Sequence, residues 1–315
     1  MTVALRAFDV GLMLMPIEDS ARGAFPRWTE ILAAARRAEE VGFAAIWIPD
    51  HLIMDIHRPG SRPEGAWEGW SLLSALAAST SRVGLGLLVS CTAFRNPALL
   101  AKMAATVDEI SGGRLILGLG AGWCKLEFRA FGYPFDHRVG RFEEAVQIIT
   151  GLLRDGRVDF QGTYYEAREC ELRPRGPRPQ GPPILIGSSS TGERMLRLAA
   201  RYADIWNRDF DAVNPGVEPY SPADLAASQS RVDAACEAIG RDPTTLGRTV
   251  GVWVDLPAAP SRGWGALTGT PEAIAAGLRR YADAGFQSAQ VWLHPNTAAG
   301  VDAFAPVLER LAAGR

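Results

Sequence analysis

Short apolar runs alternate along this chain with longer segments whose apolar residues recur at helical spacing. The runs predict buried parallel strands, and the segments between them predict amphipathic helices. The predicted strands are residues 8–15, 44–49, 83–89, 115–119, 184–187, 203–206, 248–254 and 289–293. The predicted helices are residues 27–41, 70–79, 96–110, 138–153, 193–202, 223–239, 271–284 and 302–312. Eight strands alternating with eight helices are typical of an α/β fold, the (β/α)8 TIM barrel.

The segment from residue 82 to residue 123 shows this alternation most clearly. An apolar run ends in the polar corner 90–92, and a helix begins after Asn96 and ends at the glycine pair 112–113. A second apolar run ends in the glycine-rich stretch 120–123. A strand, a helix and a second strand with a short crossover form the unit from which parallel sheets are built. Polar residues stand where the strands end, and (β/α)8 barrels carry their chemistry at that end.

Three polar insertions rich in Pro and Gly interrupt the pattern, at residues 53–69, 208–222 and 255–270. A small hairpin is predicted at residues 158–168. A (β/α)8 barrel takes about 250 residues, so the insertions account for the rest of the 315-residue chain. We therefore expect a single barrel domain with insertions over residues 1–315.

The composition of the chain indicates which kinds of molecule it does and does not bind. The formal net charge of -2 argues against nucleic-acid binding, which requires a basic face. No apolar run reaches membrane-spanning length, and residues 1–16 lack the pattern of an export signal. The four cysteines form no CxxC pair, and the four histidines form no HxH or HExxH motif. We expect a cytoplasmic protein with reduced thiols, a small-molecule substrate, no metal site, and neither nucleic acid nor membrane as a partner.

Asp50 and His51 end the second predicted strand. A carboxylate and an imidazole at this position face the barrel mouth, where His51 could bind a cofactor or act as general acid or base. The alternative is that Asp50 caps a turn and His51 is a loop residue. At the next strand end, the corner Ser90-Cys91 could press backbone against a flat ligand, or could be an ordinary strand end with a buried, inert Cys91.

A run of glycine and hydroxyl residues follows the fifth predicted strand and precedes a helix. Free N–H groups and the helix dipole favour a phosphate at such a place, although a plain N-cap is the alternative. The run is Gly187, Ser188, Ser189, Ser190 and Thr191. Three further residues at strand ends could line a substrate pocket, although tryptophans more often belong to a core or lid; they are Trp206, Trp253 and His294.

Five segments carry a resemblance to a known family: residues 42–51, 83–123, 127–146, 184–207 and 281–293. The chain resembles the bacterial luciferase-like monooxygenase superfamily, which includes coenzyme F420-dependent reductases and dehydrogenases. The join of Ser-Gly-Gly-Arg, a strand and Gly-x-Gly-Ala-Gly-Trp is the most specific part of this resemblance. Members are usually homodimers that pair through the helices here predicted at 70–79 and 96–110.

The resemblance implies roles for individual residues. Asp50 and His51 match an Asp-His pair that contacts the deazaflavin, and Ser90-Cys91 matches a bulge whose non-proline cis peptide backs the central ring. Gly120, Gly122 and Trp123 match the strand end that lets the ring lie close to backbone. Gly187, Ser188 and Thr191 match the loop that holds the cofactor phosphate.

These implications predict an F420-dependent oxidoreductase that transfers a hydride between the deazaflavin and a small organic substrate, with His51 as the catalytic residue. The substrate is expected to lack a phosphate, because sugar-phosphate dehydrogenases of this group use lysines and the chain has none after Lys125. The alternatives are an FMN-dependent luciferase-like monooxygenase, a non-catalytic cofactor-binding barrel, and a phosphate-binding barrel with isomerase chemistry.

Overall fold

The computed structural model describes residues 8–18, 23–54, 62–188, 192–208, 221–257 and 266–313. The chain divides into two compact units. The central unit consists of residues 16–25 and 48–186, and the terminal unit consists of residues 1–15, 26–47 and 187–315. The prediction of one domain over the whole chain stays a prediction.

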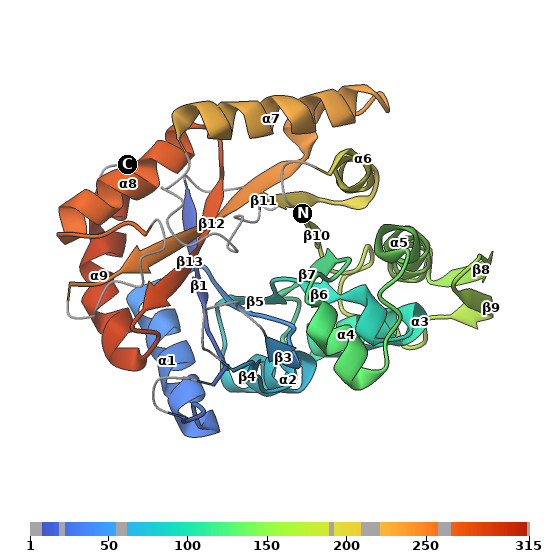
Figure 1. Ribbon diagram of the computed structural model, residues 1–315, viewed down its shortest axis with the longest axis horizontal. Coiled ribbons are helices and arrows are strands. Elements are labelled where there is room, and N and C mark those ends of the chain that lie inside the picture. Colours follow the sequence, from blue (N-terminus) through green and yellow to red (C-terminus); the bar gives the residue numbers. More distant parts are fainter. Residues whose placement is uncertain are drawn as a thin grey trace. The chain divides into compact units, whose positions relative to one another are not determined.

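The terminal unit is built on parallel strands in the order β11-β12-β13-β1-β2. These strands are β1 (Asp9–Met13), β2 (Ala45–Ile48), β11 (Ile205–Arg208), β12 (Gly247–Asp255) and β13 (Ser288–His294). The helices are α1 (Trp28–Val41), α6 (Glu193–Tyr202), α7 (Pro222–Glu237), α8 (Pro271–Asp283) and α9 (Ala298–Ala313), with a 3-10 turn, η2 (Pro243–Thr245). Helices α1, α8 and α9 lie outside the strands and cover them (Figure 1).

Helix α8 shows how the sequence sets these elements. The hydroxyl of Thr270 accepts the N–H of Ala273, and Pro271 occupies the first turn, so the helix begins where its free N–H groups are capped. Its apolar stripe, which includes Ile274 and Leu278, is fully buried. Because each such helix buries one apolar stripe, the helical periodicity of the sequence predicts the helices well.

The central unit pairs β5, β6 and β10 with β7, all parallel. The strands are β5 (Gly84–Leu87), β6 (Ser90–Cys91), β7 (Leu115–Gly120) and β10 (Ile184–Ser188), whose last two residues belong to the terminal unit. The helices are α2 (Gly69–Ser79), α3 (Pro97–Ile110), α4 (Lys125–Phe131) and α5 (Arg138–Asp155), with a 3-10 turn, η1 (Thr92–Phe94). Two antiparallel pairs complete it: β3 (Ile53–Met54) with β4 (Glu64–Gly65), and β8 (Arg157–Gln161) with β9 (Glu166–Glu171).

The strand order is β1-β2-β5-β7-β10-β11-β12-β13, which is the order of a (β/α)8 barrel and confirms the predicted fold class. Each predicted strand and helix corresponds to one of these elements, with bounds that differ by a few residues. The predicted hairpin at 158–168 is β8–β9. Helix α4 was not predicted. Among the described residues, no helix combines the length and apolar character needed to cross a bilayer.

Glycines of β7 allow the neighbouring segment to approach closely. A Cβ on Gly118 would lie 2.0 Å from the carbonyl oxygen of Leu87, and one on Gly120 would lie 2.5 Å from Cγ2 of Val89. Any larger residue at Gly118 would therefore force backbone apart. The alternating glycines of this strand thus have a packing role within the central unit.

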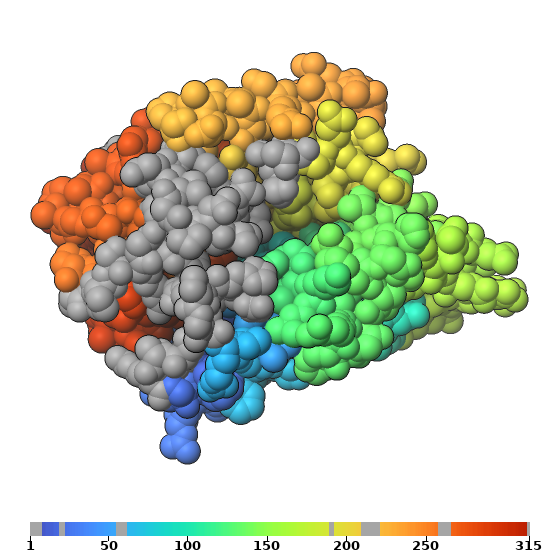
Figure 2. Space-filling model, viewed as in Figure 1, coloured from blue at the N-terminus to red at the C-terminus, as the bar shows by residue number. Residues whose placement is uncertain are grey.

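The hairpin β8–β9 is attached to α5 through one carboxylate. The two oxygens of Glu144 accept the N–H groups of Thr163, Tyr164 and Tyr165, at 2.7, 2.8 and 2.9 Å. The hairpin stands out from the surface of the central unit in Figure 2. Glu144 therefore fixes the turn of the hairpin by accepting only backbone N–H groups.

Several arginines cap the ends of helices. Among the described residues, Arg114, Arg175 and Arg241 each donate to three or more backbone carbonyl oxygens. Arg114 binds the carbonyls of Ala77, Thr80, Val83 and Ser111; Arg175 binds those of Leu153, Arg154 and Pro179; and Arg241 binds those of Ala200, Ala203 and Thr245. These carbonyls include the last ones of α2, α5 and α6, which have no partner within their helix.

Candidate active site

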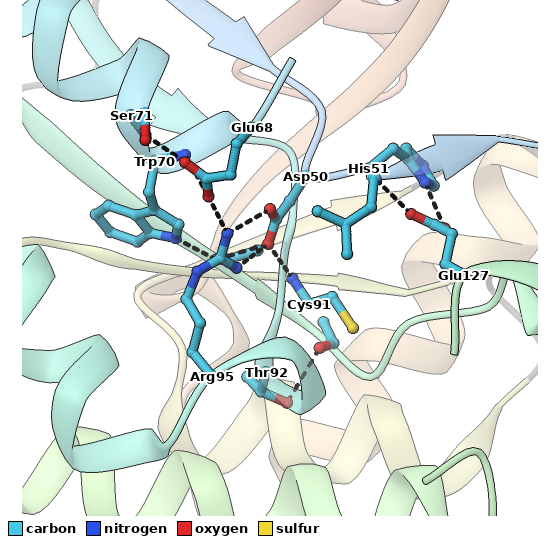
Figure 3. Close-up of polar contacts among 12 residues, drawn as sticks. Asp50, His51, Glu68, Trp70, Ser71, Cys91, Thr92, Arg95 and Glu127 are labelled. Atoms are coloured by element: carbon cyan, nitrogen blue, oxygen red, sulfur yellow. Dashed lines mark hydrogen bonds and ion pairs between the residues drawn. The ribbon is translucent and has the colours of Figure 1, made fainter. Parts of the chain in front are cut away.

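Asp50, just after β2, is the centre of a buried hydrogen-bond network in the central unit (Figure 3). Its Oδ2 accepts the N–H of Cys91 at 2.9 Å and the hydroxyl of Ser90 at 3.2 Å. The guanidinium of Arg95 donates to both carboxylate oxygens, at 2.6 and 3.0 Å. The indole N–H of Trp70 donates to the Ser90 hydroxyl at 2.8 Å. Asp50 therefore ties the end of β2 to β6 and to the start of α3.

Arg95 connects Asp50 to a second carboxylate, that of Glu68. Glu68 caps α2 by accepting the N–H groups of Trp70 and Ser71, and it forms an ion pair with Arg95. Burial works to raise the pKa of Glu68, but the hydrogen bonds from Ser71 and Arg95 lower it below its usual value. Burial likewise works to lower the pKa of Arg95, and the two carboxylates raise it. One guanidinium is thus shared by two carboxylates, and these contacts favour the charged forms of Arg95 and Glu68.

His51 follows Asp50 and is paired with a different carboxylate. Its Nδ1 lies 2.8 Å from Oε1 of Glu127, which comes from α4 (Figure 3). The other oxygen of Glu127 accepts the N–H of Leu52 at 2.6 Å. The Glu127 side chain is 1% exposed and the His51 side chain 15% exposed. With Nδ1 engaged, Nε2 is the nitrogen of His51 that can exchange a proton with a bound molecule.

Trp123 lies against His51. The two ring centroids are 5.5 Å apart at an interplanar angle of 76°, and Trp123 is 45% exposed. Gly122 before it has φ +76°, and a Cβ there would lie 2.6 Å from Sγ of Cys91. Arg138 of α5 donates to the carbonyl of Gly122 at 2.5 Å. The Gly122–Trp123 turn is therefore held in place and leaves an open aromatic face beside the histidine.

The corner Ser90-Cys91 is an extended strand, β6, in register with Leu119 and Gly120 of β7. The prediction of a cis peptide between Ser90 and Cys91 is wrong, because among the described residues the non-proline cis bond is Leu88–Val89, two residues earlier. The reason is that β6 needs its extended backbone to pair with β7 and to donate the Cys91 N–H to Asp50, so the irregular backbone precedes it. Burial, followed by the charge of Asp50, raises the pKa of the Cys91 thiol to about 12, which is the state of an inert cysteine.

The residues predicted to bind phosphate belong to the terminal unit. Gly187 and Ser188 end β10, and Ser189, Ser190 and Thr191 lie outside the described residues. The hydroxyl of Ser188 accepts the indole N–H of Trp206 at 3.0 Å. Helix α6 begins after Gly192, which offers no side chain as a cap. The phosphate role of this stretch stays a prediction.

The three residues predicted to line a substrate pocket have different surroundings. Trp206 is fully buried and stacks on Phe286 at 6.5 Å, which is the packing of a core residue. Trp253 packs against Trp292, with ring centroids 5.8 Å apart. Nδ1 of His294 lies 3.6 Å from Oδ1 of the buried Asp255. Burial does not favour a pocket role for Trp206, and contact with substrate stays a prediction for Trp253 and His294.

A family model named luciferase-like monooxygenase matches residues 8–260, which is most of the chain. The chain belongs to the luciferase-like monooxygenase family. This confirms the resemblance on which the roles of the strand-end residues were predicted.

Two relatives of this luciferase-like protein are named as F420-dependent dehydrogenases. An F420-dependent hydroxymycolic acid dehydrogenase of Mycobacterium tuberculosis is 34% identical over 227 residues, covering 70% of this chain and 58% of the relative. An F420-dependent glucose-6-phosphate dehydrogenase of Amycolatopsis mediterranei is 32% identical over 203 residues, covering 60% and 59%. A pyrimidine monooxygenase RutA of Cronobacter sakazakii is 36% identical over 182 residues, covering 56% and 50%. The chain thus spans little more than half the length of these relatives.

Solved structures show the same fold. An F420-dependent secondary alcohol dehydrogenase in complex with an F420-acetone adduct matches with a TM-score of 0.80 at 19% identity, over 97% of this chain and 99% of that chain. A riboflavin lyase (RcaE) with modified FMN and riboflavin matches with a TM-score of 0.76 at 15% identity, over 98% of this chain and 92% of that chain. At these identities the likeness supports the barrel fold alone.

Two residues that contact His51 and Asp50 were not predicted from the sequence, Glu127 and Arg95. Glu127 stands within a segment that matches the family, but α4 has only seven residues and shows no clear periodicity. Arg95 stands directly before Asn96, the N-cap of α3, and its side chain is 11% exposed because it pairs with the buried carboxylate of Asp50. In the part of the chain that the structure describes, no group of three or more His, Cys, Asp or Glu could hold a metal ion.

Proposed function

We propose that this luciferase-like protein is a coenzyme F420-dependent oxidoreductase that transfers a hydride between the deazaflavin and a small, non-phosphorylated organic substrate. The observation that carries the proposal is the pair His51–Glu127, which leaves Nε2 of His51 as a proton donor or acceptor next to the exposed ring of Trp123. The names of two relatives, both F420-dependent dehydrogenases, support the choice of cofactor.

The residues present fit such a cofactor. Trp123 offers an exposed aromatic face beside His51, which suits contact with a flat ring system. Gly187 stands shortly before the N-terminus of α6, and the dipole of a helix favours a phosphate at that end. When bound, F420 supplies the hydride chemistry, and the protein supplies orientation and proton transfer. In this proposal His51 binds the reacting oxygen of the substrate through Nε2 and takes or returns its proton.

The proposed substrate class rests on the absence of lysine from the second half of the chain. One relative is named as acting on glucose 6-phosphate, whereas this chain has no lysine after Lys125 to hold a sugar phosphate. We therefore propose a neutral alcohol or carbonyl compound as substrate. Alcohol oxidation measured by loss of F420 absorbance should exceed oxidation of glucose 6-phosphate, and the reverse order would contradict this part of the proposal.

A second candidate is an FMN-dependent luciferase-like monooxygenase, because relatives named pyrimidine monooxygenase share 35–36% identity over about half of the chain. Both cofactors carry a ribityl phosphate, so the Gly187 stretch does not separate them. Oxygen consumption coupled to substrate conversion would favour this candidate. Cofactor binding without any turnover would favour a non-catalytic barrel.

Titration of the purified apoprotein with F420 and, separately, with FMN tests the proposal most directly. We expect F420 to bind more tightly and to quench tryptophan fluorescence, because Trp123 lies beside the proposed ring site. Tighter binding of FMN would support the second candidate. Absence of binding by either cofactor would overturn both and would favour a phosphate-binding barrel of another chemistry.

We also propose a homodimer that pairs through α2 and α3. Leu99 and Ile110 on α3 are 54% and 46% exposed, and both would be covered by a partner. A monomeric mass in solution at micromolar concentration would contradict this.

A further inference from the structure

We propose that Glu127 is a positioning residue that holds His51 in a single tautomer, with the proton on Nδ1 and the lone pair on Nε2. The inference deepens the proposed function and rests on His51 acting through Nε2. Glu127 was not predicted from the sequence, and it is separated from His51 by 76 positions in the chain.

The tautomer follows from what each oxygen of Glu127 can accept. An ionised Glu127 has no proton to donate, so in that state the Nδ1 of His51, 2.8 Å from Oε1, carries the hydrogen. Oε2 is occupied by the N–H of Leu52 at 2.6 Å, so the carboxylate accepts from two donors at once. A neutral imidazole with a proton on Nδ1 has none on Nε2. Nε2 is therefore prepared to accept a proton from a bound alcohol.

The residues on both sides of His51 are anchored as well. The carboxylate of Asp50, the preceding residue, is bound by Ser90, Cys91 and Arg95. The N–H of Leu52, the following residue, is bound by Glu127. With its neighbours fixed and Trp123 against its ring, His51 keeps one orientation. Such preorganisation is what a proton-transferring group needs.

Glu127→Gln tests this because an amide cannot replace both functions of the carboxylate. The glutamine has one accepting oxygen and one donating NH2 group, but it faces two donors, Nδ1–H and the Leu52 N–H. Keeping the acceptor for Leu52 turns the NH2 group towards Nδ1. His51 must then shift its proton to Nε2, which can no longer act as a base, an effect known for carboxylate-to-amide changes beside catalytic histidines.

The first measurement is the tautomer itself, read from ¹⁵N shifts and long-range ¹H–¹⁵N couplings of labelled histidine at about pH 8, where imidazole is ordinarily neutral. The chain has four histidines, and His51→Gln assigns the signal. We expect protonated Nδ1 in the wild type and protonated Nε2 in Glu127→Gln. A wild-type signal with the proton on Nε2 overturns the proposal even if the variant does not fold.

The second measurement is turnover with F420. Glu127→Gln should lower kcat by about 10²-fold or more, with the cofactor Kd within about twofold of the wild type. Glu144→Gln is the matched control, because Glu144 also accepts backbone N–H groups through both oxygens but lies at the hairpin β8–β9. It should keep kcat within about twofold. An unchanged kcat in Glu127→Gln, or an equal loss in both variants, overturns the proposal.

The two measurements separate this proposal from the proposed function. If neither F420 nor FMN supports turnover of any substrate by the wild type, the proposed function fails. The tautomer of His51 in the wild type and in Glu127→Gln then still decides whether Glu127 sets it.

Discussion

Two histidines lie beside buried carboxylates at strand ends, one in each unit, and the two pairs differ in how they are held. His51 Nδ1 is 2.8 Å from Glu127 in the central unit, whereas His294 Nδ1 is 3.6 Å from Asp255 in the terminal unit. Both histidine side chains are 15% exposed, so burial does not distinguish them. The difference is that the first contact has the length of a hydrogen bond and the second does not.

The origin of the difference lies in the elements that carry the carboxylates. Asp255 and His294 are register partners on the neighbouring parallel strands β12 and β13, so the sheet sets the distance between their backbones. Glu127 comes from the short helix α4, which places its carboxylate without reference to strand spacing. A histidine beside a carboxylate therefore does not by itself make a hydrogen-bonded pair. The carboxylate must also come from an element that places it within hydrogen-bond distance of the ring, as α4 does for Glu127.

The largest effect expected from this comparison is on turnover. His51→Ala should lower kcat by roughly 10²–10⁴, because the group that exchanges a proton is lost. Cofactor affinity should fall much less, because the proposed phosphate contacts lie elsewhere. His294→Ala should lower kcat far less than His51→Ala. Single-turnover kinetics with cofactor binding on both variants decide the matter, and equal losses would erase the distinction between the two histidines.

The second effect concerns the stability of the region around His51. Arg95→Met leaves the fully buried side chain of Asp50 without its cation and should lower the free energy of unfolding by about 3–5 kcal/mol. Urea denaturation measures this. Arg37→Met is the control, because Arg37 pairs with Glu40 and Asp302 at the surface, where ion pairs contribute little. Similar losses of unfolding free energy in the two variants would show that the Asp50–Arg95 ion pair stabilises the protein no more than a surface ion pair does.

The third effect concerns the terminal unit. If the Gly187 stretch holds the cofactor phosphate, Gly187→Val should block backbone approach and weaken cofactor binding at least tenfold, or about 1.4 kcal/mol. Equilibrium titration with F420 gives the affinity. An unchanged Kd would show that this stretch does not bind the cofactor phosphate. The proposed function would then rest on residues of the central unit.

The smallest effect is a dependence of stability on pH. The pKa of Glu68 is lowered from 4.5 by Ser71 and Arg95, so its stabilising contribution is complete above about pH 4.5 and is lost as the pH falls through the lowered folded-state value. Its size is limited because Glu68 is 40% exposed. The stability difference between wild type and Glu68→Gln should shrink on acidification in urea titrations. A difference that grows towards low pH would have the wrong sign.

The order of elements could be predicted because it depends on local pattern. The start of α3, for example, is signalled by Asn96 and Pro97, and in the structure the Asn96 side chain accepts the N–H groups of Ala98 and Leu99. Helix α4 has seven residues, too few to show a 3.6-residue period, and it went unnoticed. Local periodicity thus predicts the long elements of the barrel and misses the short one that carries Glu127.

The partners within the site could not be predicted in the same way. Asp50 meets Arg95 across 45 positions and His51 meets Glu127 across 76, and no local signal encodes such pairings. The sequence marked Asp50 and His51 as candidate site residues. It did not show that Asp50 binds Cys91 and Arg95, or that His51 is hydrogen-bonded to a carboxylate. The misplaced cis bond has the same cause, because the pairing of β6 with β7 decides which residues of the corner are extended.

The arginines that cap helix ends have an evolutionary consequence. The chain holds only two lysines, a bias that by itself suggests a GC-rich genome. Arg114, Arg175 and Arg241 nevertheless each serve three or more carbonyls through several nitrogens of one planar group. The single nitrogen of a lysine cannot occupy those positions at once. If the base composition of the genome drifted, surface positions such as Arg37 could follow the new codon usage, while these three would remain arginine.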